Sequence, residues 1–218
     1  MNGLTMSSSA GLGNVPITWT VKGTGDMNGD GKGDLLWQDG AGDVAIWFMN
    51  GSAVAATASL GTVAPASGWS IIWATPGEIL WRNSSGDLAL WQVNGSTVQS
   101  TALGNVPNNW VVQGMGDFNG DGVRDLLFRD STSGTVAMWF LNSSGTVQST
   151  ASVASVPIAA NWSIVETGDF DGDGRSDIFW IDASGNLAFW YMNGATVSST
   201  GTLGNVGTTW SIQSLNAE

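Results

Sequence analysis

The sequence repeats one nine-residue acidic segment three times, at residues 26–34, 117–125 and 169–177. Each copy has side-chain oxygen at positions 1, 3, 5 and 9 and a glycine at position 6. Carboxylate and amide oxygens at alternate positions around a glycine-bearing turn suit a hard cation that takes roughly six to eight oxygen ligands. These segments, called loops 1, 2 and 3 below, therefore predict three metal sites.

We expect the side chains at positions 1, 3, 5 and 9 to bind the ion, together with the backbone carbonyl of position 7. Position 7 is a lysine, a valine or an arginine, so only its main chain can serve as a ligand. The expected ligands are Asp26, Asn28, Asp30, Lys32 and Asp34 in loop 1, Asp117, Asn119, Asp121, Val123 and Asp125 in loop 2, and Asp169, Asp171, Asp173, Arg175 and Asp177 in loop 3.

Calcium is the ion that fits this pattern best, since Mg²⁺ gives up its water ligands reluctantly. An EF-hand would need an acid at position 12, but Trp37, Phe128 and Trp180 stand there and the flanking segments resemble strands. The alternative is a set of solvated turns without metal, which repulsion among closely spaced carboxylates disfavours. Two roles for the ion stay open: it fixes the turn, or it bridges directly to a ligand.

The charge of the chain is concentrated in the loops. The formal net charge is −12, and 10 of the 18 acidic residues lie in loops 1–3. With only six Lys and Arg residues, a nucleic-acid partner is disfavoured. The absence of cysteine leaves the redox compartment open. No apolar run is long enough to predict a membrane span.

The elements that must position the loops belong to a longer repeat. Each full repeat predicts four short strands separated by Gly-, Asn- and Asp-rich turns. The third strand, such as 44–49, is apolar on both faces, whereas the fourth, such as 97–101, is polar and β-branched. Inner strands buried on both sides and a wet outer strand predict the blades of an all-β propeller. The repeats begin at Trp19, Trp69, Trp110, Trp162 and Trp210.

The second repeat departs from this pattern. Trp69 and Trp81 are 12 residues apart, against 18 in the other full repeats, so the segment that would form the loop is missing. Glu78 alone stands where the last aspartate would be. We therefore expect no metal in this repeat.

We expect one repeat domain over 1–218, with four complete blades and a partial strand at each end. The second blade is the one without a calcium loop. Either the chain is part of a longer array or closure involves another chain, which leaves open a homo-oligomer formed through the incomplete terminal blades. The expected segments are 1–15 (partial outer strand), 16–63, 64–106, 107–156, 157–206 and 207–218 (partial inner strand).

The segments Gly25–Leu35, Gly116–Leu126 and Gly168–Ile178 resemble the FG-GAP/VCBS repeat family, the blades of integrin-α-like propellers. The resemblance covers nearly the whole chain, weakly in the second repeat. It implies a β-propeller with calcium in the loop between the first two strands of a blade. It also implies a secreted or cell-surface protein of the adhesion or polysaccharide-associated kind. The Phe-Gly and Gly-Ala-Pro elements of integrin repeats are absent, so integrin-type partner binding does not carry over.

The 13 tryptophans suggest both a core and a binding surface. Because most recur at fixed repeat positions, we expect them to pack between blades. Trp73, outside that pattern, is our candidate for an exposed aromatic. The tryptophans expected in the core are Trp37, Trp47, Trp81, Trp91, Trp139, Trp180 and Trp190.

Catalysis has few residues available, since the chain has no His, no Cys and no paired-carboxylate pattern. Asp39, Asp130 and Asp182 recur after the second strand, which indicates a role in a turn. We therefore expect a calcium-stabilised extracellular binding or adhesion module, not an enzyme, that recognises carbohydrate or a protein surface. A spacer array without a ligand and a polysaccharide-acting enzyme domain are the alternatives.

Overall fold

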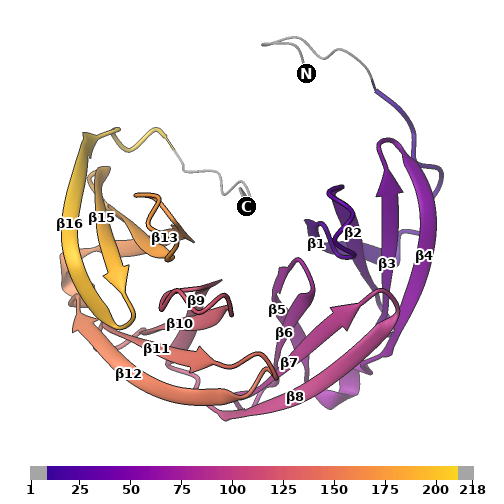
Figure 1. Ribbon diagram of the computed structural model, residues 1–218, viewed down its shortest axis with the longest axis horizontal. Helices are drawn as coiled ribbons and strands as arrows, with labels where there is room; N and C mark the ends of the chain where they lie inside the picture. The colour runs from indigo at the N-terminus through magenta and orange to yellow at the C-terminus, as the bar shows by residue number, and fades with distance from the viewer. Residues whose placement is uncertain (1–8, 211–218) are drawn as a thin grey trace. The chain divides into compact units, whose positions relative to one another are not determined.

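The computed structural model describes residues 9–210, and over this range the chain is all-β (Figure 1). Sixteen strands and two three-residue 3₁₀ helices, η1 (Pro65–Ser67) and η2 (Ile158–Ala160), make up its regular structure. In the described range, no helix has the length and apolar character needed to cross a bilayer. The strands are β1 (Trp19–Gly25), β2 (Asp34–Asp39), β3 (Asp43–Asn50), β4 (Ala53–Thr62), β5 (Ser70–Thr75), β6 (Glu78–Arg82), β7 (Asp87–Asn94), β8 (Thr97–Asn105), β9 (Trp110–Gly116), β10 (Asp125–Asp130), β11 (Thr135–Leu141), β12 (Val147–Ser155), β13 (Trp162–Gly168), β14 (Asp177–Asp182), β15 (Asn186–Asn193) and β16 (Thr196–Asn205).

The strands form four separate four-stranded sheets, each built from four consecutive strands in chain order. We number them sheets 1 to 4, from β1–β4 to β13–β16. Neighbouring strands are antiparallel, as in propeller blades, and in sheets 1, 3 and 4 the first two strands are joined by loops 1, 2 and 3. The fourth strands β4 and β16 are mostly exposed, because their polar side chains lie on the outer edge of a sheet. The predicted all-β, blade-type fold is confirmed.

The chain divides into two compact units. Unit 1 (residues 1–84 and 88–100) holds sheet 1 and most of sheet 2, and unit 2 (residues 85–87 and 101–218) holds sheets 3 and 4. In each unit, apolar side chains from two sheets form one core. A sheet that is packed by a neighbour needs apolar residues on the facing side of every inner strand. This explains the apolar residues at the core-facing positions of the third strands, such as Val44 and Ile46 of β3.

The first strands of neighbouring sheets approach closely within each unit, and glycine permits this. A Cβ added at Gly23 of β1 would lie 2.8 Å from the Cβ of Ala74 of β5. At Gly114 of β9 it would lie 2.7 Å from the side chain of Thr167 of β13. Both distances are shorter than real Cβ contacts, so a larger residue would force the sheets apart.

The tryptophans divide into two groups. Trp81 and Trp180 are almost fully buried, at 1% exposure, and the other five expected in the core are partly buried. Our expectation for Trp73 was wrong, because it lies in β5 and is only partly exposed. The strongly exposed tryptophan of the described residues is Trp210, at 74%. Sequence alone placed Trp73 at the surface because the repeat pattern gave it no packing partner.

The predicted partial strands at both ends fall largely outside the described residues, which exclude 1–8 and 211–218. In the described portions, residues 9–15 and 207–210, the backbone is not in a strand.

Candidate metal centres

The backbone of each loop reverses sharply at two glycines, at positions 4 and 6. In loop 1, Gly29 and Gly31 have φ angles of 78° and 80°, in the left-handed region that side chains disfavour. The equivalent glycines of loops 2 and 3 have φ between 78° and 85°. The sequence pattern pointed to the glycine at position 6, and the structure adds position 4.

The first aspartate of each loop organises the turn from inside. Asp26 accepts the N–H groups of Gly29 and Asp30 on Oδ1, at 2.7 and 3.0 Å, and that of Gly31 on Oδ2, at 2.6 Å. Asn28 in turn accepts the N–H of Asp30 at 2.9 Å. Loops 2 and 3 repeat the same hydrogen bonds with their own residues. The three loops therefore share one conformation.

The aspartate at position 9 is buried and anchors the loop to the sheet. Asp34 has 0% exposure and accepts the N–H of Met27, at position 2, on Oδ2 at 3.0 Å. Its Oδ1 accepts the N–H of Met49, at the end of β3, at 2.8 Å. Asp125 and Asp177 make the same two bonds in loops 2 and 3, at 2.8–3.1 Å. Sequence reasoning missed both backbone partners, although the turn that recurs after the third strand was a signal.

Burial disfavours the charged form of two of these anchor residues, Asp125 and Asp177. It raises the pKa of the Asp125 carboxyl to about 7, although two backbone N–H groups lower it, and the acids at positions 5 and 1 of the loop raise it further. Burial likewise raises the pKa of Asp177. At the loop surface the opposite holds, since the N–H of Gly31 contributes most to lowering the pKa of Asp26. Each buried carboxyl thus lies beside other acidic groups, where a cation would favour its charged form.

Loop 3 brings three carboxylates together. Asp169, Asp171 and Asp177 each offer an oxygen, and these oxygens lie within 4.8 Å of one another, so they could hold a metal ion. Position 3 is Asn28 in loop 1 and Asn119 in loop 2, so each of those loops has one carboxylate fewer than loop 3. Hard, closely spaced oxygen donors of this kind fit calcium.

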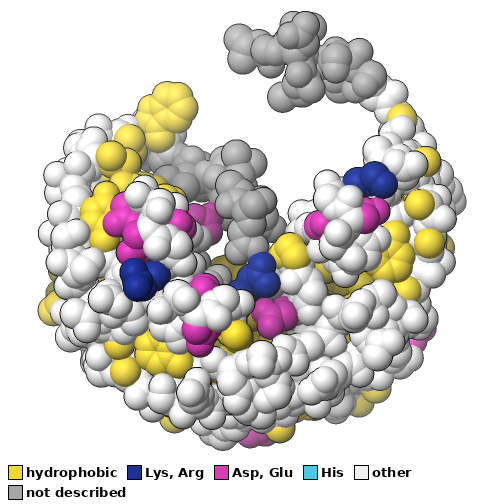
Figure 2. Space-filling model, viewed as in Figure 1, with side chains coloured by type: hydrophobic (Ala, Val, Ile, Leu, Met, Phe, Trp, Pro, Cys, Tyr) yellow, Lys and Arg dark blue, Asp and Glu magenta, His cyan; other side chains and the backbone are white. Residues whose placement is uncertain are grey.

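The basic side chains at position 7, in loops 1 and 3, form ion pairs with the aspartate at position 5. Lys32 Nζ lies 3.4 Å from Asp30, and Arg175 donates to Asp173 at 2.9 Å. Figure 2 shows acidic side chains beside Lys and Arg side chains at the β1–β2 and β13–β14 loops. These ion pairs are exposed, so they contribute little to stability. The backbone carbonyl of position 7 therefore stays the expected ligand from that position.

Sheet 2 has no acidic loop, and a different group accepts the N–H at the end of its third strand. Its β5 and β6 are joined by the two-residue turn Pro76-Gly77. The N–H of Val93, at the end of β7, donates to the carbonyl of Gly77 at 2.7 Å. In the other sheets the equivalent N–H donates to the position-9 aspartate. A backbone carbonyl therefore replaces the carboxylate where the loop is missing.

Loops 2 and 3 are joined within unit 2. The N–H of Ser176, in loop 3, donates to the carbonyl of Asp117, in loop 2, at 2.7 Å. The N–H of Gly194, after β15, donates to the carbonyl of Phe118 at 2.9 Å. The conformation of loop 2 is therefore coupled to sheet 4 as well as to its own sheet.

The aspartates that recur after the second strand hold the next turn, as predicted. Asp130 accepts the N–H and the hydroxyl of Thr132, at 2.7 and 2.6 Å, and the N–H of Ser133 at 3.1 Å. Asp39 and Asp182 bind their own turns through similar N–H contacts. The hydrogen bonds to Thr132 contribute most to lowering the pKa of Asp130.

Replacing Asp130 with alanine is expected to lower the thermal midpoint by a few degrees, because the turn loses its acceptor. The pKa of Asp130 is lowered on folding, so its contribution is full above its unfolded pKa, near 4, and declines as the pH falls below it. Melting curves of both proteins at neutral pH and at pH 3 test this. The difference between the two midpoints must shrink at the lower pH, and a constant difference would contradict this role.

The comparisons with known proteins agree with this geometry. Residues 117–180, which run from loop 2 through β10–β12, β13 and loop 3 into β14, match the family described as FG-GAP-like repeat. This segment of the chain is therefore similar to an FG-GAP-like repeat. A comparison with curated proteins gave no match. The matched FG-GAP segment holds two complete acidic loops, and loop 1 reproduces their hydrogen bonds.

Proposed function

We propose that this chain is a calcium-stabilised extracellular module in which one Ca²⁺ binds in each of loops 1, 2 and 3. The observation that carries the proposal is the shared loop conformation, with its buried position-9 aspartate and its oxygen-bearing side chains at positions 3 and 5. The ligands we assign are those expected from the sequence, with the carbonyls of Lys32, Val123 and Arg175 at position 7. FG-GAP repeats occur in extracellular proteins, which supports a secreted or cell-surface location.

We further propose that the module recognises carbohydrate or a protein surface and does not catalyse a reaction. Three carboxylates that catalysis could use, Asp39, Asp130 and Asp182, bind turn N–H groups instead. Each repeat with the expected boundaries would then be one blade. A spacer array without a ligand remains the second candidate, since calcium that fixes turns would serve it equally well.

Calcium binding is tested by isothermal titration calorimetry and native mass spectrometry of the full chain. Three bound ions per chain support the proposal, and a chain without bound metal at millimolar calcium contradicts it. Recognition is tested separately, by retention on glycan arrays and immobilised polysaccharides with calcium present. A spacer would show no retention while keeping its calcium dependence, and an enzyme would release reducing ends or unsaturated products.

Loop 3 is expected to bind calcium more tightly than loops 1 and 2, because Asp171 adds a carboxylate at position 3. Replacing Asp171 with asparagine should weaken binding at this loop by roughly tenfold, the effect of about 1.4 kcal/mol. The reverse change, Asn119→Asp, should tighten loop 2. Calorimetry of the two variants measures both shifts, and equal affinities in all three proteins would refute the ranking.

A further inference from the structure

One tryptophan pair recurs in the repeats and packs differently in different sheets. In sheet 2, Trp81 and Trp91 have ring centroids 4.8 Å apart at an interplanar angle of 53°. They belong to the core of unit 1, where Leu36 and Ile46 of sheet 1 are fully buried. In sheet 4, the pair Trp180–Trp190 takes the same geometry, at 4.8 Å and 55°, in the core of unit 2. The pair is thus one half of the packing between two sheets.

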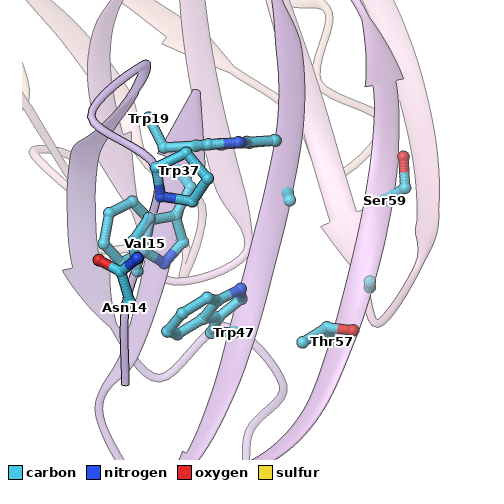
Figure 3. A pocket seen from close by; sticks show the side chains of 10 residues that line it. Asn14, Val15, Trp19, Trp37, Trp47, Thr57 and Ser59 are labelled. Carbon is cyan, nitrogen blue, oxygen red and sulfur yellow. The ribbon is translucent and has the colours of Figure 1, made fainter. Parts of the chain in front are cut away.

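Among the described residues of unit 1, no second sheet packs against the equivalent pair in sheet 1, and only the segment 14–16 lies beside it. Trp37 and Trp47 keep the geometry, at 5.1 Å and 49°, but line a pocket of about 340 Å³ (Figure 3). Trp19 closes one side of the pocket, and Thr57 of β4 lies on another. Trp37 is partly exposed, whereas its equivalents in sheets 2 and 4 are at 1%. We call this surface the tryptophan face.

Sheet 4 presents the opposite half of the same packing. Phe170, at position 2 of loop 3, is 41% exposed, whereas its equivalents Met27 and Phe118 are buried at 2% and 0%. Leu203 of β16 is 66% exposed, whereas its equivalent Leu60 in β4 is buried at 8%. Phe170 and Leu203 lie on the same side of sheet 4. In sheet 1 the equivalent side packs against sheet 2, and in sheet 3 it packs against sheet 4.

Aromatic side chains fill this side of sheet 4. Phe179 and Phe189 stack at 4.5 Å with an interplanar angle of 12°, and Tyr191 stacks on Phe189 at 5.9 Å. Phe170 packs against both phenylalanines, at 5.9 and 4.9 Å. Phe179 and Phe189 stand where sheet 1 has Leu36 and Ile46, the residues that pack against a tryptophan pair. We call this surface the phenylalanine face.

We propose that the phenylalanine face of one copy of this chain binds the tryptophan face of a second copy, head to tail. The two faces are the two halves of the packing that joins sheets 1 and 2 and sheets 3 and 4, so their apolar surfaces are complementary by repetition. Aromatic clusters are also what interface centres are rich in. The partner is a second copy of the chain, which goes beyond the proposed function.

The proposed contact between copies differs from the packing between sheets of one chain at the first strand of the sheet, β13. Glu166 of β13 stands where β1 has Gly23 and β9 has Gly114, and these glycines allow the closest approach between sheets. A glutamate there keeps the first strands farther apart. The aromatic part of the face therefore carries the contact. Because a head-to-tail contact uses two different surfaces, it builds rings or longer chains of copies and not only symmetric dimers.

Sedimentation velocity of the full chain, over a range from micromolar to hundreds of micromolar, tests the proposal. The wild type is expected to self-associate. Leu203→Glu on one face and Thr57→Glu on the other should each weaken association by roughly tenfold or more, because docking would bury an unpaired charge. Both sites are exposed, so the variants should fold, which circular dichroism checks. Ile158→Glu, at an exposed apolar site on η2 that belongs to neither face, is the matched control and should leave association unchanged.

Mixing the two variants distinguishes this contact from others. Each variant keeps one intact face, so Leu203→Glu and Thr57→Glu together should form a one-to-one complex that neither forms alone. A wild type that is monomeric throughout, variants that associate as the wild type does, or a mixture without a complex would each overturn the proposal. So would a monomeric wild type whose tryptophan fluorescence responds to an oligosaccharide, since the pocket would then belong to sugars.

Discussion

Removing calcium is expected to lower the thermal midpoint of the chain by roughly 5–20 °C. At about 2 mM free calcium and dissociation constants of about 0.1–1 mM, typical of extracellular modules, each site contributes about 0.6–1.8 kcal/mol. Three sites together contribute about 2–5 kcal/mol, and about 2–4 °C per kcal/mol is usual for chains of this size. The physical cause is the repulsion among loop carboxylates, which the bound ion neutralises.

Melting curves with calcium and with an excess of chelator measure this effect. Magnesium is the matched control, because it should restore little of the lost midpoint. Sodium chloride at high concentration tests the repulsion separately, since screening should recover part of the loss in the chelated protein. An unchanged midpoint in chelator, together with no bound metal by mass spectrometry, would remove the basis for the three sites.

The second large effect is expected from Asp125→Ala, which should destabilise the chain by about 2–5 kcal/mol even in chelator. Asp125 is fully buried and accepts the N–H groups of Phe118 and Leu141. Alanine leaves both buried donors without an acceptor, and each orphaned donor costs about 1–3 kcal/mol. Since this loss concerns the protein alone, calcium does not reverse it. Urea unfolding with and without calcium gives the two free energies.

Asp121→Ala is the matched comparison in the same loop. Asp121 is exposed, and its Oδ1 accepts the N–H of Val123 within the loop. Its loss should remove one of three bound ions, lower the stability of unit 2 in calcium, and change little in chelator. If Asp121→Ala and Asp125→Ala behaved alike in chelator, position 9 would be a ligand only. The anchoring role assigned to Asp125 would then be wrong.

The loop 2 variant should also affect sheet 4. The carbonyls of Asp117 and Phe118 accept N–H groups from Ser176 and Gly194, which belong to the next repeat. Loss of the loop 2 ion is therefore expected to increase hydrogen exchange at Ser176 and Gly194. Sheet 2, where Gly77 takes the place of the loop, should be affected less.

Much of the fold could be predicted from the sequence, because the same order of strands and turns recurs in each repeat. Alternating turns and strands, the apolar third strand and the missing loop at Trp69–Trp81 predicted four-stranded blades. The loop ligands could be proposed from spacing alone, since oxygen at alternate positions around a glycine turn is a local pattern. The turn role of Asp130 was equally local, and it is confirmed.

What the sequence could not supply depends on residues distant along the chain. The N–H of Met49 reaches Asp34 only because β3 pairs with β2, 15 residues away, so the buried anchor emerges from the folded sheet. Trp73 looked exposed in sequence because burial depends on neighbours that no periodicity names. Trp37 and Trp81 occupy the same repeat position, yet one lines a pocket and the other is buried in a core. The sequence by itself determined the four-stranded blade and the acidic loop, because both depend on the spacing of residues that are close together along the chain. Only the tertiary structure decided which faces of the four sheets are covered, because the burial of a face depends on the sheet that packs against it.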